Sequence, residues 1–466
     1  MSVIANSEDI EKLRSWGRDH LWMQGERASD LQARGQYQIV ARAEGCYIYD
    51  LDGNRYIDGN ASGFVKFIGH GRVEIARAVA AQMAQLSYTP NVFGQTTVPA
   101  ITLARKLAEL APGTLSRTFF CTGGSDAIEV ALQLARQVHH IRGKTRKFKV
   151  ISRRPEYHGS TYAAMSLGSR NDRNNAIFEP LMPGVLQVDA PNCTRCPWGL
   201  GRPNECCGLG VTSLRQLIEG EGADTIAALV ATPMRVGGAL PPDGYWPAVR
   251  RLCTENDILL IADEVTVGFG RLGTWFGMQR FGITPDIMAL GKGLTSGELP
   301  VGAAMATQEI AEAFDGARGS LGQFAHGTTF GGHPVVMAAA LENIRIMESE
   351  GLIENSASMG RHLHQRLLEM ASRHACIDSV TGGLGLLATI SVVGNRKTGA
   401  RYPGGSNGPA MARLAALVRK RGLSIKVGNT INIAPPLVIG RALVDEIVQI
   451  LDDSLTDMER EFPCDA

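Results

Sequence analysis

The sequence predicts an α/β protein with a large domain on a mostly parallel, doubly wound sheet and a smaller α+β domain. Strand-like apolar runs alternate with segments of helical periodicity through residue 330, a pattern typical of a parallel sheet with crossover helices. Helices with only two further strand candidates follow. With 466 residues, 44% of them hydrophobic, the chain is long enough to fill two cores.

Charge and composition exclude several classes of partner. Lys and Arg number 47 against 46 Asp and Glu, so the net charge of +1 favours neither nucleic acid nor an anionic membrane. No apolar run approaches the ~18 residues of a membrane span. The N-terminus lacks the apolar core of a signal peptide, and we expect a cytoplasmic protein.

The N-terminal part reads as a helix, a small antiparallel hairpin and two amphipathic helices. The hairpin is indicated by apolar alternation around the turn Asp52-Gly53-Asn54, and the last helix stops at Pro112-Gly113. These elements are expected at 9–24, 37–60, 73–86 and 98–111.

A glycine-rich turn then joins a strand at 117–121 to a helix at 127–136. Gly124 and Ser125 lie where the helix begins, and free backbone N–H groups with the positive end of the helix dipole suit a phosphate group. Ser125 and Asp126 could equally be ordinary helix caps.

Two strand ends carry the remaining chemistry. The apolar run 258–262 ends in Asp263-Glu264, and the run 287–290 leads into Gly291-Lys292-Gly293. Ligands of open α/β sheets bind beyond the carboxyl ends of the strands. A desolvated lysine can form a Schiff base with an aldehyde cofactor, and a carboxylate can pair with a pyridinium nitrogen; pyridoxal phosphate needs both. A lysine reaching back to water and a capping aspartate are the alternatives.

Four of the nine cysteines crowd into one segment, at positions 193, 196, 206 and 207. A Cys-x-x-Cys pair followed by two thiols could hold zinc, but the second pair is adjacent, which strains tetrahedral chelation. We expect a packed loop and no metal.

The C-terminal part begins with a loop around His326-Gly327-Thr328-Thr329. Helices are expected at 335–350, 355–373 and 441–461, with strands near 386–393 and 431–433. The predicted division is an N-terminal segment, 1–60, packing with the small domain; a large cofactor-binding domain, 61–333; and the small domain, 334–466.

Taken together, these segments resemble the class III (omega) aminotransferases, which are fold type I pyridoxal phosphate enzymes. The motifs occur in the family's order over roughly residues 35 to 450. They are FFCTGGSDAIEVALQLAR at 119–136, YHGST at 157–161, DEVTVGFGRLG at 263–273, PDIMALGKGLTSG at 285–297, HGTTFGGHP at 326–334 and APPLVI at 434–439.

The resemblance implies a sheet of the seven-stranded type and a role for each motif residue. Lys292 would carry the cofactor as a Schiff base and move protons, and Asp263 would keep the pyridine nitrogen protonated. Thr329 would reach the phosphate of the neighbouring subunit's cofactor, which implies a homodimer with shared active sites, or a dimer of dimers. The expected cofactor-binding residues are Gly124, Ser125, Tyr157, His158, Asp263, Val265, Lys292 and Thr329, with Tyr157 and Val265 on opposite faces of the ring.

Departures from the family's pattern bear on the substrate. Asn432 stands where a carboxylate-binding arginine is common, Thr232-Pro233 replaces Glu-Pro, and Ser160 follows the Tyr-His-Gly motif in place of arginine. With the acidic Glu298 after the lysine loop, these changes favour a polar or cationic amine donor. Arg235 is the candidate for the oxo acid, pyruvate or 2-oxoglutarate. The expected substrate-binding residues are Trp22, Phe93, Arg235, Glu298 and Asn432.

The expected reaction is transamination in two halves, from amine to cofactor and from cofactor to oxo acid. Racemisation, aminomutation and decarboxylation use the same lysine and aspartate and stay open. A cofactor- or zinc-binding protein without turnover is a remote alternative. The donor and the preferred acceptor cannot be read from the sequence.

Overall fold

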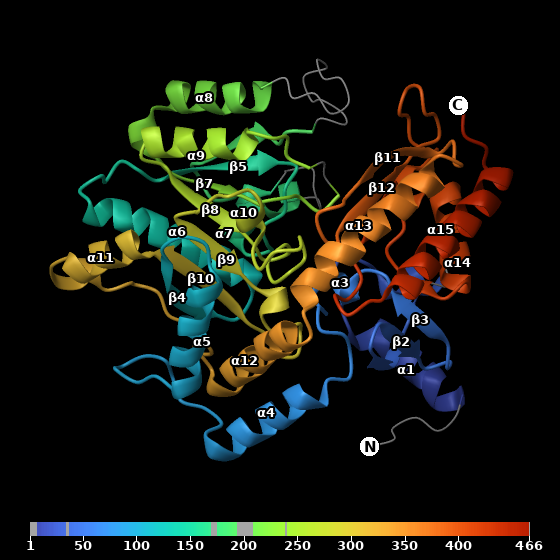
Figure 1. The fold of residues 1–466 in the computed structure, drawn as a ribbon, viewed down its shortest axis with the longest axis horizontal. Helices are drawn as coiled ribbons and strands as arrows, with labels where there is room; N and C mark the ends of the chain where they lie inside the picture. The colour runs from blue at the N-terminus through green and yellow to red at the C-terminus, as the bar shows by residue number, and fades with distance from the viewer. Residues whose placement is uncertain (1–6, 34–36, 169–174, 193–207, 238–239, 466) are drawn as a thin grey trace.

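The computed structural model describes residues 7–33, 37–168, 175–192, 208–237 and 240–465. Its centre is a seven-stranded sheet in the order β4-β10-β9-β8-β7-β5-β6 (Figure 1). Only β10 runs antiparallel to its neighbours, so the predicted mostly parallel sheet is confirmed. In this order the strands are Leu115–Cys121, Gly302–Thr307, Ile287–Leu290, Leu259–Asp263, Ile226–Ala231, Lys149–Arg154 and Val185–Asp189.

The central strands are covered on both faces, as expected for a parallel sheet. Every residue of β7, β8, β9 and β10 is buried. Alternate side chains enter two cores: Ala228 and Ile261 pack with helix α6, whereas Leu229 and Leu260 pack with α8 and α9. The helices between β3 and α12 are α3 (Ala61–Phe64), α4 (Val73–Gln85), α5 (Val98–Leu110), α6 (Gly124–Ile141), α7 (Tyr162–Leu167), α8 (Leu209–Glu221), α9 (Tyr245–Glu255), α10 (Gly277–Arg280) and α11 (Gln308–Gly316).

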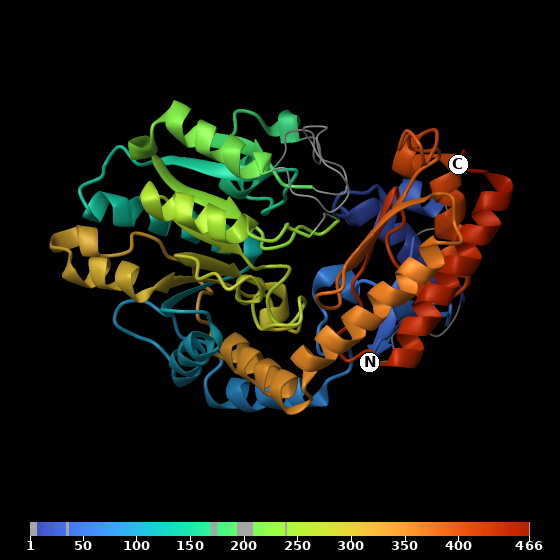
Figure 2. The same ribbon diagram turned by 45° about the horizontal axis from the view of Figure 1, so that its top comes forward.

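Strands from the N-terminal and C-terminal parts of the chain form one sheet. Strand β3 pairs antiparallel with β2 and parallel with β13, so the N-terminal hairpin and a C-terminal segment lie side by side (Figure 2). A second sheet has the order β11-β12-β14. The predicted domain boundaries at residues 60 and 333 stay a prediction. The elements are α1 (Ser7–His20), α2 (Ala28–Ala33), β1 (Val40–Glu44), β2 (Tyr47–Asp50), β3 (Arg55–Asp58), α12 (Pro334–Ser349), α13 (Leu352–Ala371), β11 (Ile377–Thr381), β12 (Ala388–Val392), α14 (Pro409–Lys420), β13 (Leu423–Ser424), β14 (Thr430–Ile433) and α15 (Arg441–Glu461).

One buried arginine joins the glycine-rich segment after β8 to the C-terminal part. The Arg271 guanidinium donates hydrogen bonds of 2.7 Å to the carbonyls of Leu386 and Pro435, and it lies 4.3 Å from the centre of the Phe67 ring. Burial lowers the pKa of Arg271 to about 9. A charged group held by carbonyls and an aromatic face ties the two parts together at this point.

A lysine side chain is buried at the amino ends of the central strands. The Lys147 ammonium donates to the carbonyls of Ala223 (2.9 Å), Ile226 (3.1 Å), Asn256 (3.2 Å) and Asp257 (2.8 Å). Only 4% of Lys147 is exposed, and burial lowers its pKa. The carbonyls lie where β7 and β8 begin, so this ammonium links the amino ends of two strands.

None of the helices in the described part of the chain is both long enough and apolar enough to cross a bilayer.

Candidate active site

Asp263 is the last residue of β8 and only 4% of it is exposed. Because successive strand residues point to opposite faces, the next residue, Glu264, is directed elsewhere. Its carboxylate accepts bonds of 2.8 Å from the backbone N–H groups of Gly277 and Met278, where α10 begins. Burial raises the pKa of Glu264 to about 7. Asp263 is therefore the acid of this pair that stands at the carboxyl end of the sheet, where its Oδ1 accepts from the Val265 N–H at 3.1 Å.

Lys292 lies beside the end of β8. Asp263 is in register with Ala289 of β9, and the lysine follows three residues later. Its Nζ donates to Thr266 Oγ1 at 2.7 Å, and its backbone has the left-handed φ of 42°. A non-glycine residue in that region is uncommon and needs support from its surroundings. The support comes from α12, where the Asn343 amide donates to the carbonyls that follow the lysine, Gly293 (2.9 Å) and Leu294 (3.1 Å).

Val265 packs between two glycines of different motifs. A Cβ on Gly124 would lie 2.6 Å from Val265 Cγ1, and one on Gly291 would lie 3.3 Å from the same atom. Any side chain at Gly124 would therefore displace Val265. This close approach brings the start of α6, the end of β8 and the lysine loop into one cluster.

The start of α6 forms a cradle with open space beside it. The helix begins at Gly124, three residues earlier than predicted. Apart from Gly123 and its two chain neighbours, no atom of the described chain lies within 4 Å of the position that a Cβ on Gly123 would take. Ser125 Oγ accepts from the Ser160 N–H at 3.1 Å, so the Tyr-His-Gly segment is held against this turn. Gly159 makes that possible, because its φ is 144° and a Cβ there would lie 2.5 Å from Ser125 Oγ.

His158 lies directly behind Asp263. Its Nδ1 is 2.7 Å from Asp263 Oδ2, and its Nε2 is in ion-pair contact with Glu156 Oε2 at 3.3 Å. Burial by itself would lower the pKa of His158, but the two carboxylates raise it to about 9. Glu156 also pairs with the Arg153 guanidinium at 2.5 Å. Sequence reasoning missed Glu156, Arg153 and Thr266; a charged pair three residues apart at the exit of a buried strand was the available signal.

The described residues fit pyridoxal phosphate. The start of α6 offers backbone N–H groups and open space for the phosphate, and Lys292 offers an amine for the aldehyde. Asp263 offers a carboxylate for the ring nitrogen. The Tyr157 ring is 43% exposed next to His158, so a flat face is accessible for stacking, and its hydroxyl lies 3.0 Å from Ser160 Oγ. The stacking roles of Tyr157 and Val265 stay predictions.

Three of the predicted residues lie on the surface of the single chain. Trp22 is 98% exposed, Phe93 is 90% exposed and Thr329 is exposed. The Thr329 carbonyl accepts from the Tyr88 hydroxyl at 2.9 Å, so the segments around residues 88 and 329 form one surface. The chain alone does not bring these side chains to Lys292 in any contact among the residues described.

The other predicted substrate residues are already engaged within the chain. Glu298 forms an ion pair with Lys66. Asn432 Oδ1 accepts from Thr389 Oγ1 at 2.8 Å. Arg235 donates to the Gly237 carbonyl at 3.1 Å, and both amide atoms of Asn432 lie within 4 Å of the position of a Cβ on Gly237. The loop that carries Arg235 thus approaches Asn432.

The cysteine-rich segment falls outside the described residues, so its expected packing is not tested. Elsewhere in the described chain no group of three or more His, Cys, Asp or Glu side chains is placed to hold a metal ion.

The chain is similar to known aminotransferases over nearly its full length. Residues 31–455 match the sequence profile described as "Aminotransferase class-III". The adenosylmethionine-8-amino-7-oxononanoate aminotransferase of Geobacter sulfurreducens is 35% identical over 96% of this chain and 98% of its own length. The putrescine–pyruvate aminotransferase of Pseudomonas aeruginosa is 36% identical over 94% and 95%.

A solved structure shares the whole fold. The omega transaminase from Pseudomonas jessenii, in complex with PMP, superposes with a TM-score of 0.91 at 32% identity, covering 97% of this chain and 99% of that one.

Proposed function

The chain belongs to the class III aminotransferases, which depend on pyridoxal phosphate, and we propose that it moves an amino group from a polar primary amine to an oxo acid such as pyruvate or 2-oxoglutarate. One observation carries the assignment of roles. The start of α6 and the loop that carries Lys292 both approach Val265, two residues after Asp263, at the carboxyl ends of the central strands.

The bound cofactor supplies an aldehyde that takes up the amino group and a ring that delocalises the electrons left when the substrate C–H bond breaks. Lys292 would hold the cofactor through its amine, and the same amine would serve as the general acid and base that moves the proton at the substrate carbon. Asp263 would accept a hydrogen bond from the protonated ring nitrogen. The N–H groups at the start of α6 would bind the phosphate.

Two predicted substrate positions bear on the nature of the donor, because one is a neutral amide and the other is a paired carboxylate. Asn432 presents an amide where the family commonly has arginine, and Glu298 is balanced by Lys66. A donor with a carboxylate would find no fixed cation at Asn432, whereas a polar or cationic amine needs none. The putrescine–pyruvate relative supports a donor of this kind. Arg235 is the proposed partner of the oxo-acid carboxylate.

A donor and acceptor screen tests this function. Diamines, amino-sugar amines, taurine and α-amino acids are each offered with pyruvate or 2-oxoglutarate, and the alanine or glutamate formed is measured. We expect polar amines to exceed α-amino acids, Lys292→Ala to be inactive and Arg235→Leu to raise KM for the acceptor. Best turnover with an ordinary α-amino acid would overturn the donor class. Racemisation or CO2 release without amino transfer would overturn the reaction.

We also propose a homodimer with shared sites. Phe93 and Thr329, both predicted to serve a site, are exposed on one chain, and Tyr88 links their segments. Tyr88 and Phe330 add exposed aromatic surface around them, with ring centres 6.3 Å apart. A second chain covering this surface would bury it and bring Thr329 to the partner's phosphate.

Subunit exchange tests the sharing. Lys292→Ala and Thr329→Ala, each expected to be severely impaired, are mixed under conditions that exchange subunits. Mixed dimers would contain one site free of both changes, so activity should return. Activity that stays at the level of the separate variants after proven exchange would contradict shared sites.

A further inference from the structure

Behind Asp263 lies a buried chain of alternating charges, and of its members the proposed mechanism uses only Asp263. Its members are Asp263, His158, Glu156 and Arg153, and each contacts the next: 2.7 Å, 3.3 Å and 2.5 Å. None is more than 4% exposed. Buried charges on this scale are costly unless each is paired, and here every group has an opposite charge on at least one side.

We propose that Glu156 is a positioning residue, which with Arg153 keeps the His158 ring doubly protonated, so that His158 gives Asp263 a fixed hydrogen bond and orients its carboxyl group towards the cofactor nitrogen. The inference rests on the proposed function for the role of Asp263. It concerns only this chain's own residues.

The protonation state follows from the geometry of the ring. The His158 Nδ1 is hydrogen-bonded to Asp263 Oδ2, and Nε2 lies 3.3 Å from Glu156 Oε2, within ion-pair distance but outside hydrogen-bond geometry. A neutral imidazole carries one N–H, so one lone pair would have to face a carboxylate. The raised pKa of His158, about 9, agrees with the doubly protonated ring.

Glu156 in turn is held from several directions. Arg153 donates to its Oε1 at 2.5 Å, and Thr232, which follows β7, donates from its hydroxyl at 3.0 Å and its backbone N–H at 3.4 Å. Burial would raise the pKa of Glu156, but Arg153 and His158 hold it below its ordinary value. Arg153 also donates to the Tyr245 hydroxyl at 3.2 Å. With Asp263, these are the titratable and charged groups that face or adjoin the ring from β5, β8 and α9.

Thr232, which contacts Glu156, occupies a position at which this sequence departs from the family's pattern. Thr232 stands where members of the family usually have the glutamate of a Glu-Pro pair, and the Glu156 carboxylate reaches this very position from the end of β5. A carboxylate has thus been supplied from a different strand, adjacent to the histidine. The consequence for chemistry is that Asp263 receives a fixed hydrogen bond from a cation on the side away from the cofactor. Its orientation is then fixed from the side of the histidine.

A histidine titration tests the proposal. The full chain, with its cofactor, is labelled at histidine Cε1, and the His158 signal is identified among the ten histidines by its loss in His158→Gln. In the unsubstituted protein its midpoint should lie near pH 9. In Glu156→Gln it should fall by about 1–2 pH units, because one of two opposite charges is gone. Asp189→Asn removes a more exposed carboxylate that pairs with Arg154 at the end of the neighbouring strand, and it should leave the midpoint unchanged.

Two further variants separate an effect on the titration of His158 from a role in folding alone. Arg153→Met with Glu156→Gln removes both charges of the pair and should fold even where the single change does not, because a buried pair can often be replaced without loss. Its midpoint should also be low. Adding Thr232→Glu to Glu156→Gln should raise the midpoint again. A midpoint within a few tenths of the original in the Glu156 variants would overturn the proposal. So would a double variant that fails to fold, because the pair would then serve the fold alone. Since turnover does not enter the readout, failure of the amine screen with the expected titration would strike only the proposed function.

Discussion

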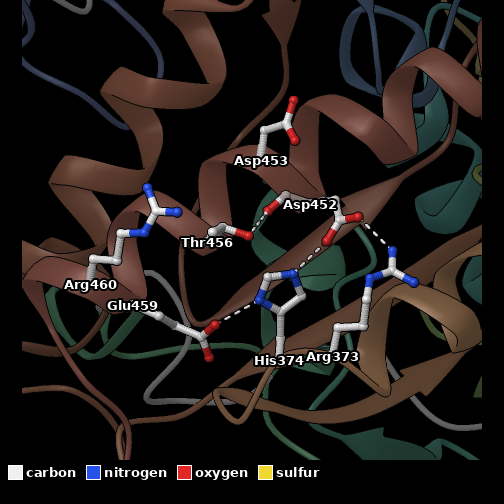
Figure 3. A pocket seen from close by; sticks show the side chains of 7 residues that line it. All are labelled: Arg373, His374, Asp452, Asp453, Thr456, Glu459 and Arg460. Carbon is white, nitrogen blue, oxygen red and sulfur yellow. Dashed lines mark hydrogen bonds and ion pairs between the residues drawn. The ribbon is translucent and has the colours of Figure 1, made fainter.

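Two histidines of this molecule each lie between two carboxylates, in very different places. His158 stands between Asp263 and Glu156 in the large domain. His374, between α13 and β11, has Glu459 at 2.6 Å from Nδ1 and Asp452 at 2.7 Å from Nε2 (Figure 3). Burial would lower the pKa of His374, but these two carboxylates raise it.

The difference lies in what else the carboxylates contact. Both partners of His374 come from α15, and their remaining oxygens are satisfied within the chain. Glu459 Oε1 accepts from the Cys376 N–H at 2.8 Å. Asp452 Oδ2 accepts from Arg373 at 2.5 Å (Figure 3). This cluster fastens a helix to the start of a strand. Asp263 instead lies at the open end of the sheet beside the lysine, so the same side-chain types that lock structure in one place can orient a reactive group in the other.

The largest expected effect is on turnover. Asp263→Asn should lower kcat by on the order of 10³-fold, because the amide cannot keep the cofactor nitrogen protonated. Asp452→Asn, the matching change in the other cluster, should leave kcat within about twofold. The measurement is steady-state transamination with saturating cofactor. Equal losses of kcat in the two variants would contradict the view that only the cluster around Asp263 acts in turnover.

The next effect is on stability. His374→Gln leaves two carboxylates without their shared cation, and we expect the free energy of unfolding to fall by about 2–4 kcal/mol, with turnover of the folded protein retained. Urea denaturation followed by fluorescence measures it. His362→Gln, at a more exposed pair with Asp445, is the control and should cost less. An unchanged midpoint for His374→Gln would show that the cluster does not fasten α15.

A smaller effect is the pH dependence of that stabilisation. The folded pKa of His374 is raised, so its contribution is fully present below the unfolded value of about 6.5 and is lost as pH rises through the folded value. Asp452 and Glu459 have lowered pKa values, and their contributions are lost only in acid. Between pH 6 and pH 9 the urea midpoint should therefore decline more steeply in the original protein than in His374→Gln. Parallel slopes would contradict the assignment.

The smallest effect concerns the outer arginine. Arg373 is about half exposed and pairs with Asp452 at the rim of the cluster. Arg373→Met should lower the free energy of unfolding by about 0.2–1 kcal/mol, because exposed ion pairs are weak. The loss should shrink further in high salt. A loss as large as that of His374→Gln would mean that the arginine, rather than the histidine, holds the carboxylates.

Much of the site could be predicted because its signals are local. Lys292 and Asp263 each end an apolar run, and the glycine turn before α6 precedes a strongly helical segment. The strands of the sheet were harder to predict from the sequence. Strand β10, GAAMAT, consists largely of small residues with low strand propensity, and only its buried position between β4 and β9 makes it a strand.

What sequence reasoning missed depends on contacts between distant segments. Glu156 reads as an exposed residue before an aromatic, and its partner Thr232 is 76 positions away. Glu298 reads as a free acid, because Lys66 lies 232 positions earlier in the chain. Pairings of that kind have no periodic or compositional signature. Glu156 meets Thr232 because β5 and β7 are neighbours in the sheet.

The buried ammonium of Lys147 can be used to measure how often this end of the sheet opens. Amine-acylating reagents attack only an accessible, uncharged amine, and here the amine is 4% exposed and held by four carbonyls. Modification must await a separation of the segments around residues 223–226 and 256–257. The rate at which Lys147 is labelled, read by mass spectrometry beside exposed lysines such as Lys144, would therefore time the opening of this end of the sheet.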